Sequence, residues 1–250
     1  MTTRCHYEPL SSQSTRVVTI LGGPPTAPIR CKFCVLPPWL GKAWKSLHGR
    51  AVDYEALSYV WGPLSQPAEV ILCDGQPLSI TANLADAIRS LRLPDRPRPL
   101  WIDQIGINQN DMAERSKQVL LMRDIYRNAD RVISWLGPDP EANAPAALRF
   151  LREIADGHFK DVGDRFAPAL QGFLSKHGLP DIGAAEWMSI DALLGLPYFT
   201  RVWILQEVIL ARRLTFLWGH IEISQELLAE FLNWAMRNPS LYNYRGVLLD

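Results

Sequence analysis

The chain has 250 residues, 48% of them hydrophobic and 21% charged, which is typical of a globular protein with a substantial core. Its 26 basic and 26 acidic residues give a formal net charge of zero, and without basic runs this argues against a nucleic-acid partner. No apolar run is long enough for a membrane span, and the N-terminal MTTRCHYEPLSSQ has no signal-peptide core, so we expect a cytoplasmic protein.

The first half of the chain alternates apolar strands with turns. We expect strands over residues 16–21, 29–36 and 55–63, followed by a β-hairpin over 69–80. Asp74-Gly75 is the expected two-residue turn of that hairpin, because both residue types tolerate positive φ. The following ANLADAIRSLR has the apolar spacing of an amphipathic helix, which Thr81 or Asn83 can cap.

The second half continues the alternation with longer helices. Asp111 and Glu114 have the spacing of a capping box at the start of one of them. We expect strands over 99–107 and 131–138, helices over 111–129, 141–156, 199–212 and 225–238, and a hairpin over 214–224. This order predicts an α/β fold with a mostly parallel central sheet flanked by helices, N-terminal strand and hairpin additions, and a helical insertion near 140–195.

The four cysteines are too few for a disulfide framework. Cys31-Lys-Phe-Cys34 has the spacing of half a zinc site, with Cys5, His6 and His48 as conceivable further ligands. The surrounding IRCKFCVL alternates like a strand, which would point Cys31 and Cys34 to opposite faces. We therefore expect a strand here, and no metal site.

Polar, aromatic and glycine residues that suit a ligand site lie at the ends of three expected strands, one of which ends in Trp135-Leu-Gly137. In an open parallel sheet, ligands bind beyond the carboxyl ends of the strands. Ser58, Trp61 and Gly62 lie at the end of one strand, and Asp103 and Asn108 at or after the end of another. Asp103 could equally accept a hydrogen bond from a neighbouring loop, and Asn108 could be a turn residue.

The stretch RVWILQEV (201–208) places an amide and a carboxylate within an apolar run. On a helix, Ile209 belongs to an apolar arc, whereas Trp203, Gln206 and Glu207 lie on the other side. Two interpretations follow from the pattern alone. The polar side is either a solvated helix face or the wall of a site.

Three blocks of the sequence together resemble the fungal heterokaryon-incompatibility (HET) domain in order and spacing. They are YEALSYVWG (54–62), LWIDQIGINQND (100–111) with the following 114–137, and RVWILQE (201–207). The resemblance covers roughly residues 16–220, and implies a single HET domain over 1–250, to which family members often add further C-terminal regions. One departure is Gly106, where the family usually has a cysteine, so any role of that thiol is absent here.

The resemblance also implies a function. HET domains trigger growth arrest or cell death when genetically unlike fungal cells fuse, and the family is similar to Toll/interleukin-receptor (TIR) domains, which have a flavodoxin-like sheet. Enzymatic TIR domains cleave the nicotinamide–ribose bond of NAD with the glutamate of a W-x-x-x-E segment, and Trp203 to Glu207 has that form. We therefore expect Glu207 to be catalytic and NAD to be the substrate, with no cofactor. The expected substrate-binding residues, which would form one cleft with it, are Ser58, Trp61, Gly62, Asp103, Asn108, Trp203 and Gln206.

Two other functions fit the same resemblance. The domain could be a non-catalytic signalling module that associates with itself or with another incompatibility protein. It could also bind a nucleotide without turning it over. Release of nicotinamide from NAD separates the first expectation from both alternatives.

Overall fold

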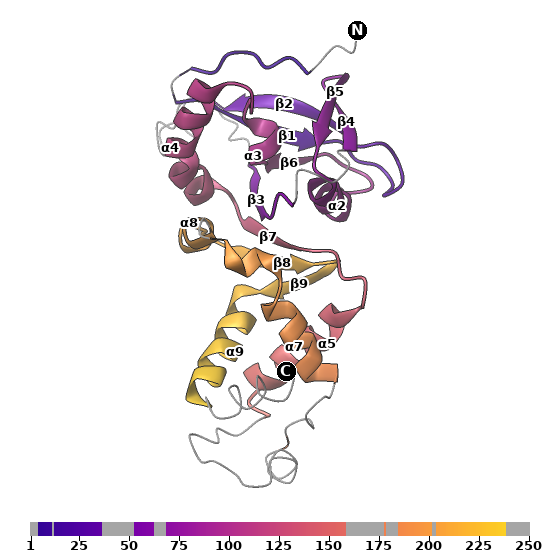
Figure 1. Cartoon of the computed structure of the whole chain (residues 1–250), viewed down its shortest axis with the longest axis vertical. Coiled ribbons are helices and arrows are strands. Elements are labelled where there is room, and N and C mark those ends of the chain that lie inside the picture. Colours follow the sequence, from indigo (N-terminus) through magenta and orange to yellow (C-terminus); the bar gives the residue numbers. More distant parts are fainter. Residues whose placement is uncertain are drawn as a thin grey trace.

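A mixed nine-stranded sheet forms the centre of the computed structural model, which describes residues 5–11, 13–36, 53–62, 69–158, 178, 185–201 and 204–238 (Figure 1). The strand order is β5-β4-β2-β1-β6-β3-β7-β8-β9. The strands are β1 (Thr15–Ile20), β2 (Arg30–Leu36), β3 (Glu55–Tyr59), β4 (Glu69–Cys73), β5 (Gln76–Ile80), β6 (Arg98–Trp101), β7 (Val132–Gly137), β8 (Leu214–Trp218) and β9 (Ile221–Ser224).

The parallel part of the sheet is narrower than the sequence suggested. β6, β3, β7 and β8 are parallel neighbours, which confirms one parallel group containing the three strands of the sequence blocks. The description "mostly parallel" is wrong for the whole sheet, because four of its eight neighbouring pairs are antiparallel. Short connections explain three of these pairs: β1–β2, β4–β5 and β8–β9 are each joined by a turn or short loop, which can only reverse the chain.

The strand order reverses between β3 and β7. After β3 the chain forms β4 and β5 at the far edge of the sheet, then adds β6 on one side of β3, and later adds β7 on the other side. At such a switch point the two connections leave the sheet in opposite directions, and the carboxyl ends of the strands are left open to a ligand. A ligand site is therefore expected at the carboxyl ends of β3 and β7.

Helices cover both faces of the sheet. They are α2 (Ala82–Leu91), α3 (Asp103–Gly106), α4 (Met112–Asn128), α5 (Asn143–Ala155), α7 (Ala185–Leu194), the 3₁₀ turn η1 (Pro197–Thr200), α8 (Ile204–Ile209) and α9 (Gln225–Arg237). Alternate strand residues enter two separate cores: Ala56 faces the core of α4, α5, α7 and α9, and Leu57 faces the core of α2 and α3. Part of the expected 140–195 insertion, residues 159–177 and 179–184, lies outside the described residues.

Two expected elements end earlier or are divided. The strand expected over 99–107 stops at Trp101, because the Asp103 carboxylate accepts the Gln104 N–H and starts the one-turn helix α3. The helix expected over 199–212 is η1 followed by the six-residue α8, with Arg201 in an extended conformation between them.

The cysteine pair lies in a strand, as the alternation indicated. Cys31 and Cys34 both belong to β2, and Cys31 packs in the α2 core whereas Cys34 contacts the opposite core. Cys31 stands beside Cys73 of β4 in the parallel register. Within the described ranges, no three cysteine, histidine or acidic side chains are grouped closely enough to bind a metal ion.

A buried ion pair ties the N-terminal strand to the loop after α3. Arg16 of β1 is 1% exposed and donates to both Glu114 carboxylate oxygens, at 2.5 and 3.2 Å, and to the Gly106 carbonyl at 3.2 Å. Asp111 caps α4 as expected, but Glu114 does not complete a capping box with it. Glu114 instead accepts the N–H of Asn108 at 2.7 Å.

Gly106, where the HET pattern usually has a cysteine, lies against the backbone of β1. A Cβ atom at this position would lie 2.8 Å from the Arg16 carbonyl oxygen, closer than real Cβ atoms approach backbone. We predict that Gly106→Cys lowers the free energy of unfolding by about 1–3 kcal/mol, because α3 would have to move away from β1. Urea denaturation measures the change. The exposed Ala113→Cys is the control for the thiol itself, and equal stability of both variants would contradict the prediction.

Candidate functional site

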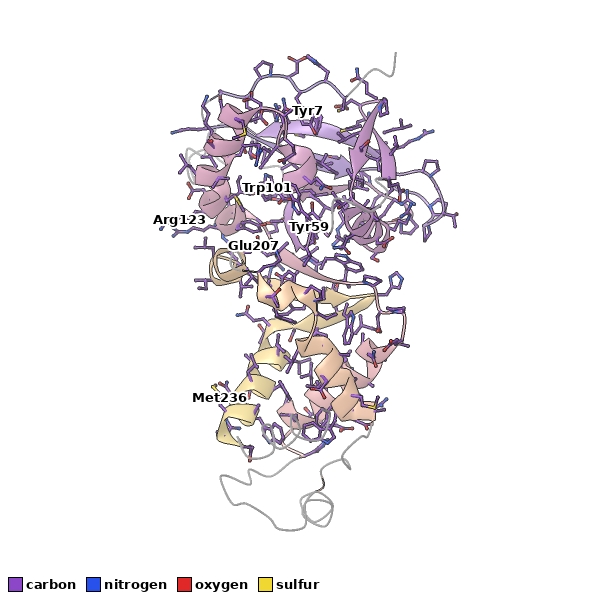
Figure 2. The ribbon with its side chains drawn as sticks, viewed as in Figure 1. Tyr7, Tyr59, Trp101, Arg123, Glu207 and Met236 are labelled. Carbon is purple, nitrogen blue, oxygen red and sulfur yellow. The ribbon has the colours of Figure 1, made fainter. Side chains whose placement is uncertain are left out.

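Glu207 is a buried carboxylate at the carboxyl end of β3 (Figure 2). Glu207 as a whole residue is 2% exposed, and its side chain points from α8 toward the sheet. Ser58 of β3 donates a hydrogen bond to one carboxylate oxygen, and Arg201 donates one to each oxygen, both at 3.1 Å. The helix-face interpretation is therefore wrong in its geometry: Glu207 faces inward, while Ile209 of the supposed apolar arc is 74% exposed.

Three hydroxyl groups extend this network across the switch point. Ser58 and Ser134 are register partners in β3 and β7, so their side chains leave the sheet on the same face. The Tyr198 hydroxyl lies 2.7 Å from Ser58 Oγ and donates to Ser134 Oγ at 2.6 Å. Small hydroxyl residues in two apolar strands thus leave room for the Tyr198 ring and the Glu207 carboxylate.

The charges of this network balance locally. Burial lowers the pKa of Arg201, but the neighbouring Glu207 outweighs this and raises it above its usual value. Burial raises the pKa of Tyr198 to about 12, so its phenol remains a neutral donor at physiological pH. The side chain of Arg201 is 21% exposed, and it is the part of the ion pair that reaches solvent.

Asp103 forms a second polar group at the end of β6. Its carboxylate accepts the Trp61 indole N–H at 2.8 Å and the Gln104 N–H at 2.7 Å. Burial raises the pKa of Asp103, the bond from Trp61 opposes this, and the nearby charge of Glu207 adds to the increase. The two carboxylates are therefore close enough to interact, and Asp103 also has the loop-holding contacts that its alternative interpretation required.

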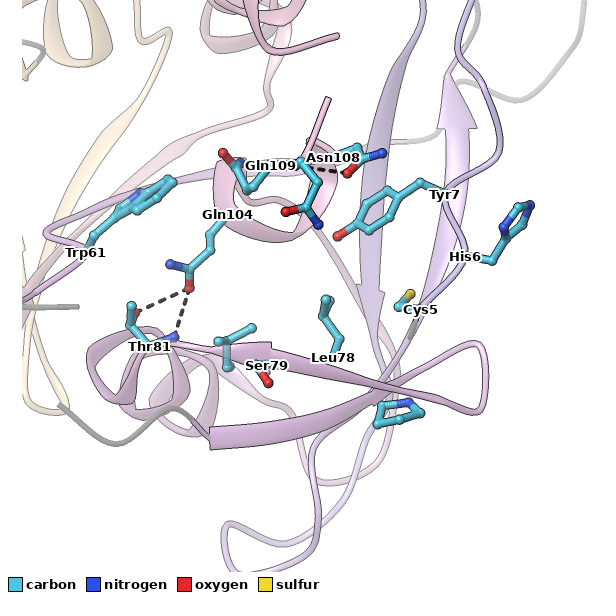
Figure 3. Close-up of a pocket in the computed structure, with 13 residues that line it drawn as sticks. Cys5, His6, Tyr7, Trp61, Leu78, Ser79, Thr81, Gln104, Asn108 and Gln109 are labelled. Carbon is cyan, nitrogen blue, oxygen red and sulfur yellow. Dashed lines mark hydrogen bonds between the residues drawn. The ribbon is translucent and has the colours of Figure 1, made fainter. Parts of the chain in front are cut away.

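A slot of about 810 Å³ is lined by Trp61 and Gln104, which both donate hydrogen bonds to Asp103 (Figure 3). It is bounded by Cys5, His6 and Tyr7, by Trp61, by Pro77 to Thr81, and by Gln104 with Asn108 to Asn110. Of the expected substrate-binding residues that the structure describes, Trp61 and Asn108 line it. Ser58, Asp103 and Glu207 are not among its lining residues, and they belong to the hydrogen-bonded groups at the ends of β3 and β6.

The remaining expected residues are placed as follows. Gly62 has a φ of +78°, a conformation that favours glycine, and so it shapes the turn after Trp61. Trp203 and the side chain of Gln206 lie outside the described part of the structure. The sequence interpretation missed Arg201, although it begins the RVWILQE block, and it missed Tyr198, which carries no pattern at all.

No helix in the described ranges combines the length and the apolar composition that crossing a bilayer requires.

The chain resembles known proteins over most of its length. Residues 54–207 match the family model described as heterokaryon incompatibility protein (HET). The chain is 34% identical over 227 residues to "Heterokaryon incompatibility protein 6, OR allele" of Neurospora crassa. That alignment covers 78% of this chain but 33% of the relative, so the chain spans about a third of the relative's length. No solved structure matches the chain.

The Glu207–Arg201 pair should contribute measurably to stability. We predict that Glu207→Gln and Arg201→Gln each lower the free energy of unfolding by about 1–3 kcal/mol, because each leaves a partly buried polar or charged partner without its counter-charge. The double variant should lose less than the sum of the two, since both changes remove the same interaction. Urea denaturation of all four proteins gives the coupling energy. Strict additivity would show that the pair is energetically unimportant.

Proposed function

Because the chain belongs to the heterokaryon incompatibility (HET) family, we propose that it acts in the cytoplasm in the fungal incompatibility response by cleaving the nicotinamide–ribose bond of NAD. One observation carries the enzymatic part of this proposal. Glu207, Ser58 and Arg201 converge at the β3–β7 switch point, where open sheets of this kind bind ligands. The relation to TIR domains is part of the proposal.

The order of the parallel strands supports that relation. Numbered along the chain from β3, the parallel strands lie in the spatial order 2-1-3-4, the order of the first four strands of a flavodoxin-like sheet. In that arrangement, the ligand site lies between the first and third strands, which correspond here to β3 and β7.

The chemistry requires a carboxylate at this place. Breaking an N-glycosidic bond passes through an oxocarbenium-like state on the ribose, which a negative charge beside the sugar stabilises. Nicotinamide leaves a cationic substrate as a neutral ring, so a strong general acid is not needed. We assign the stabilising charge to Glu207, which Ser58 orients from β3.

Movement of Arg201 would let the Glu207 carboxylate contact the substrate. Glu207 is paired with Arg201 in this structure, and Arg201 is the more exposed partner. A dinucleotide substrate carries a pyrophosphate. A guanidinium can pair with a pyrophosphate as well as it pairs with a carboxylate. We propose that Arg201 turns to the pyrophosphate when the substrate binds. This exposes Glu207 to the ribose and uses part of the binding energy to do so.

One observation favours a second candidate function, that of a non-catalytic module which associates with itself or with another incompatibility protein. Glu207 is almost completely buried and has three hydrogen bonds, as expected for a purely structural ion pair. In this case Glu207 holds α8 against β3, and the active surface lies elsewhere. A protein that binds a nucleotide without cleaving it would combine the two functions.

A substitution at Glu207 tests the proposal, provided that its effect on stability is matched. We predict that Glu207→Gln lowers the rate of nicotinamide release from NAD about 10²–10³-fold, because glutamine lacks the charge that stabilises the ribosyl cation. Glu114→Gln is the matched control, since it makes the same change in another buried Arg–Glu pair, far along the chain from α8. Chromatographic detection of nicotinamide, normalised to folded protein, gives the rates.

The outcomes separate the two functions. Loss of release in Glu207→Gln with retention in Glu114→Gln supports the enzyme. No release from the parent protein, or equal release from both variants, overturns it. Sedimentation of the same two variants then tests the non-catalytic module. If each variant changes its association state in proportion to its loss of unfolding free energy, Glu207 has a structural role.

A further inference from the structure

The edge strand β5 directs unpaired main-chain groups into the slot. Asp74 and Gly75 both have positive φ, so they form the tight turn that makes Cys73 and Gln76 the first hydrogen-bonded pair of the hairpin. Hydrogen-bonded and non-hydrogen-bonded pairs alternate along an antiparallel ladder. The main-chain groups of Pro77 and Ser79 therefore point away from β4, toward the open side of the sheet.

The chain already uses the first part of this edge. The N–H of Cys5 donates to the Pro77 carbonyl at 3.3 Å, and the N–H of His6 donates to the Gln76 side chain at 2.8 Å. An extended segment therefore lies alongside β5 next to the turn. Pro77 needs no partner for an N–H, whereas Ser79 offers both an N–H and a carbonyl that no described residue outside the hairpin occupies.

Carboxamide groups face this edge from the opposite wall of the slot (Figure 3). The Gln104 oxygen accepts from Thr81, so its NH₂ group is left to donate. The Gln109 NH₂ group donates to the Asp103 carbonyl, so its oxygen is left to accept. The Asn108 oxygen accepts from Asn110, which leaves a second NH₂ donor.

The described residues that line the slot carry no permanent charge. None of its lining residues is lysine, arginine, aspartate or glutamate. The Trp61 ring lies at one end, and the Tyr7 ring lies toward the other (Figure 3). An ionic ligand would find no permanent counter-charge among these described residues, whereas a neutral, amide-bearing ligand would find donors and acceptors on both walls.

We propose that this slot binds an extended, uncharged segment of a partner protein, which adds to β5 as a further strand beside Ser79. An extended peptide has N–H and carbonyl groups on both of its edges. β5 satisfies one edge, and the carboxamides of Gln104, Asn108 and Gln109 satisfy the other. A second copy of this sheet does not fit, because each β5 edge carries its own carboxamide wall. The proposal is independent of any activity at Glu207.

Two substitutions at Ser79 test whether the main chain makes the contact. Ser79→Pro removes the outward N–H without removing a bond of the β4–β5 ladder, and Pro77 shows that this edge tolerates proline. Ser79→Ala, the matched control, removes the hydroxyl but keeps the N–H. Peptides are selected from a phage-displayed random heptapeptide library against the full chain, then synthesised with blocked ends and titrated calorimetrically.

We expect selected peptides to be uncharged, to bind Ser79→Ala like the parent, and to bind Ser79→Pro about ten-fold more weakly or worse. Hydrogen exchange at the Ser79 amide should slow when such a peptide is added. Thermal melting verifies that both variants remain folded, and the same titrations on Glu207→Gln should be unchanged. Failure to recover a binding peptide, equal binding by Ser79→Pro, or equal loss in both variants would overturn the proposal. Adenosine, a neutral small molecule, is titrated in the same way. Binding of adenosine without binding of peptides would also overturn the proposal.

Discussion

The burial of one negative charge governs how this end of the sheet is built. A carboxylate removed from water is stable only where a cation and hydrogen-bond donors replace its hydration. Glu207 obtains them from two different elements, Arg201 before α8 and Ser58 in β3. This requirement explains why the chain is extended at Arg201 instead of continuing as a helix, and why a serine stands between the buried Leu57 and Tyr59 of β3. The position of α8 against the switch point follows from the pairing.

The buried Arg16–Glu114 pair differs from the Arg201–Glu207 pair in its exposure to solvent. Arg16 and Glu114 are both enclosed, and they connect β1, α4 and the loop after α3, so neither side chain can leave without disrupting the fold. Arg201 and Glu207 lie six residues apart on one segment, and Arg201 retains contact with water. The Arg16–Glu114 pair is therefore closed to solvent, whereas the Arg201–Glu207 pair reaches solvent through Arg201.

The sequence indicated the strands better than it indicated their partners. β3, β6 and β7 are short apolar runs that end in polar or glycine residues, and their parallel grouping follows from the helices between them. Short connections make three of the antiparallel pairs predictable, whereas the β1–β6 pair depends on which edge β1 joins, and periodicity carries no such information. In α8, six residues are too few for an apolar arc to determine orientation, and pairing with Arg201 turned Glu207 inward. Arg201 could have been suspected as the counter-charge of Glu207, whereas Tyr198 became visible only in three dimensions.

The parallel register has a consequence for how the chain reaches this structure. β8 pairs with β7, yet Val132 and its partner Leu214 are separated by about 80 residues of sequence. At translation rates of roughly 5–20 residues per second, β7 leaves the ribosome about 4–16 s before its neighbour exists. During that interval one side of a strand that is wholly buried in the finished protein is unpaired. The nascent chain is thus most prone to aggregation, and most dependent on chaperones, while the region between α5 and α8 is being synthesised.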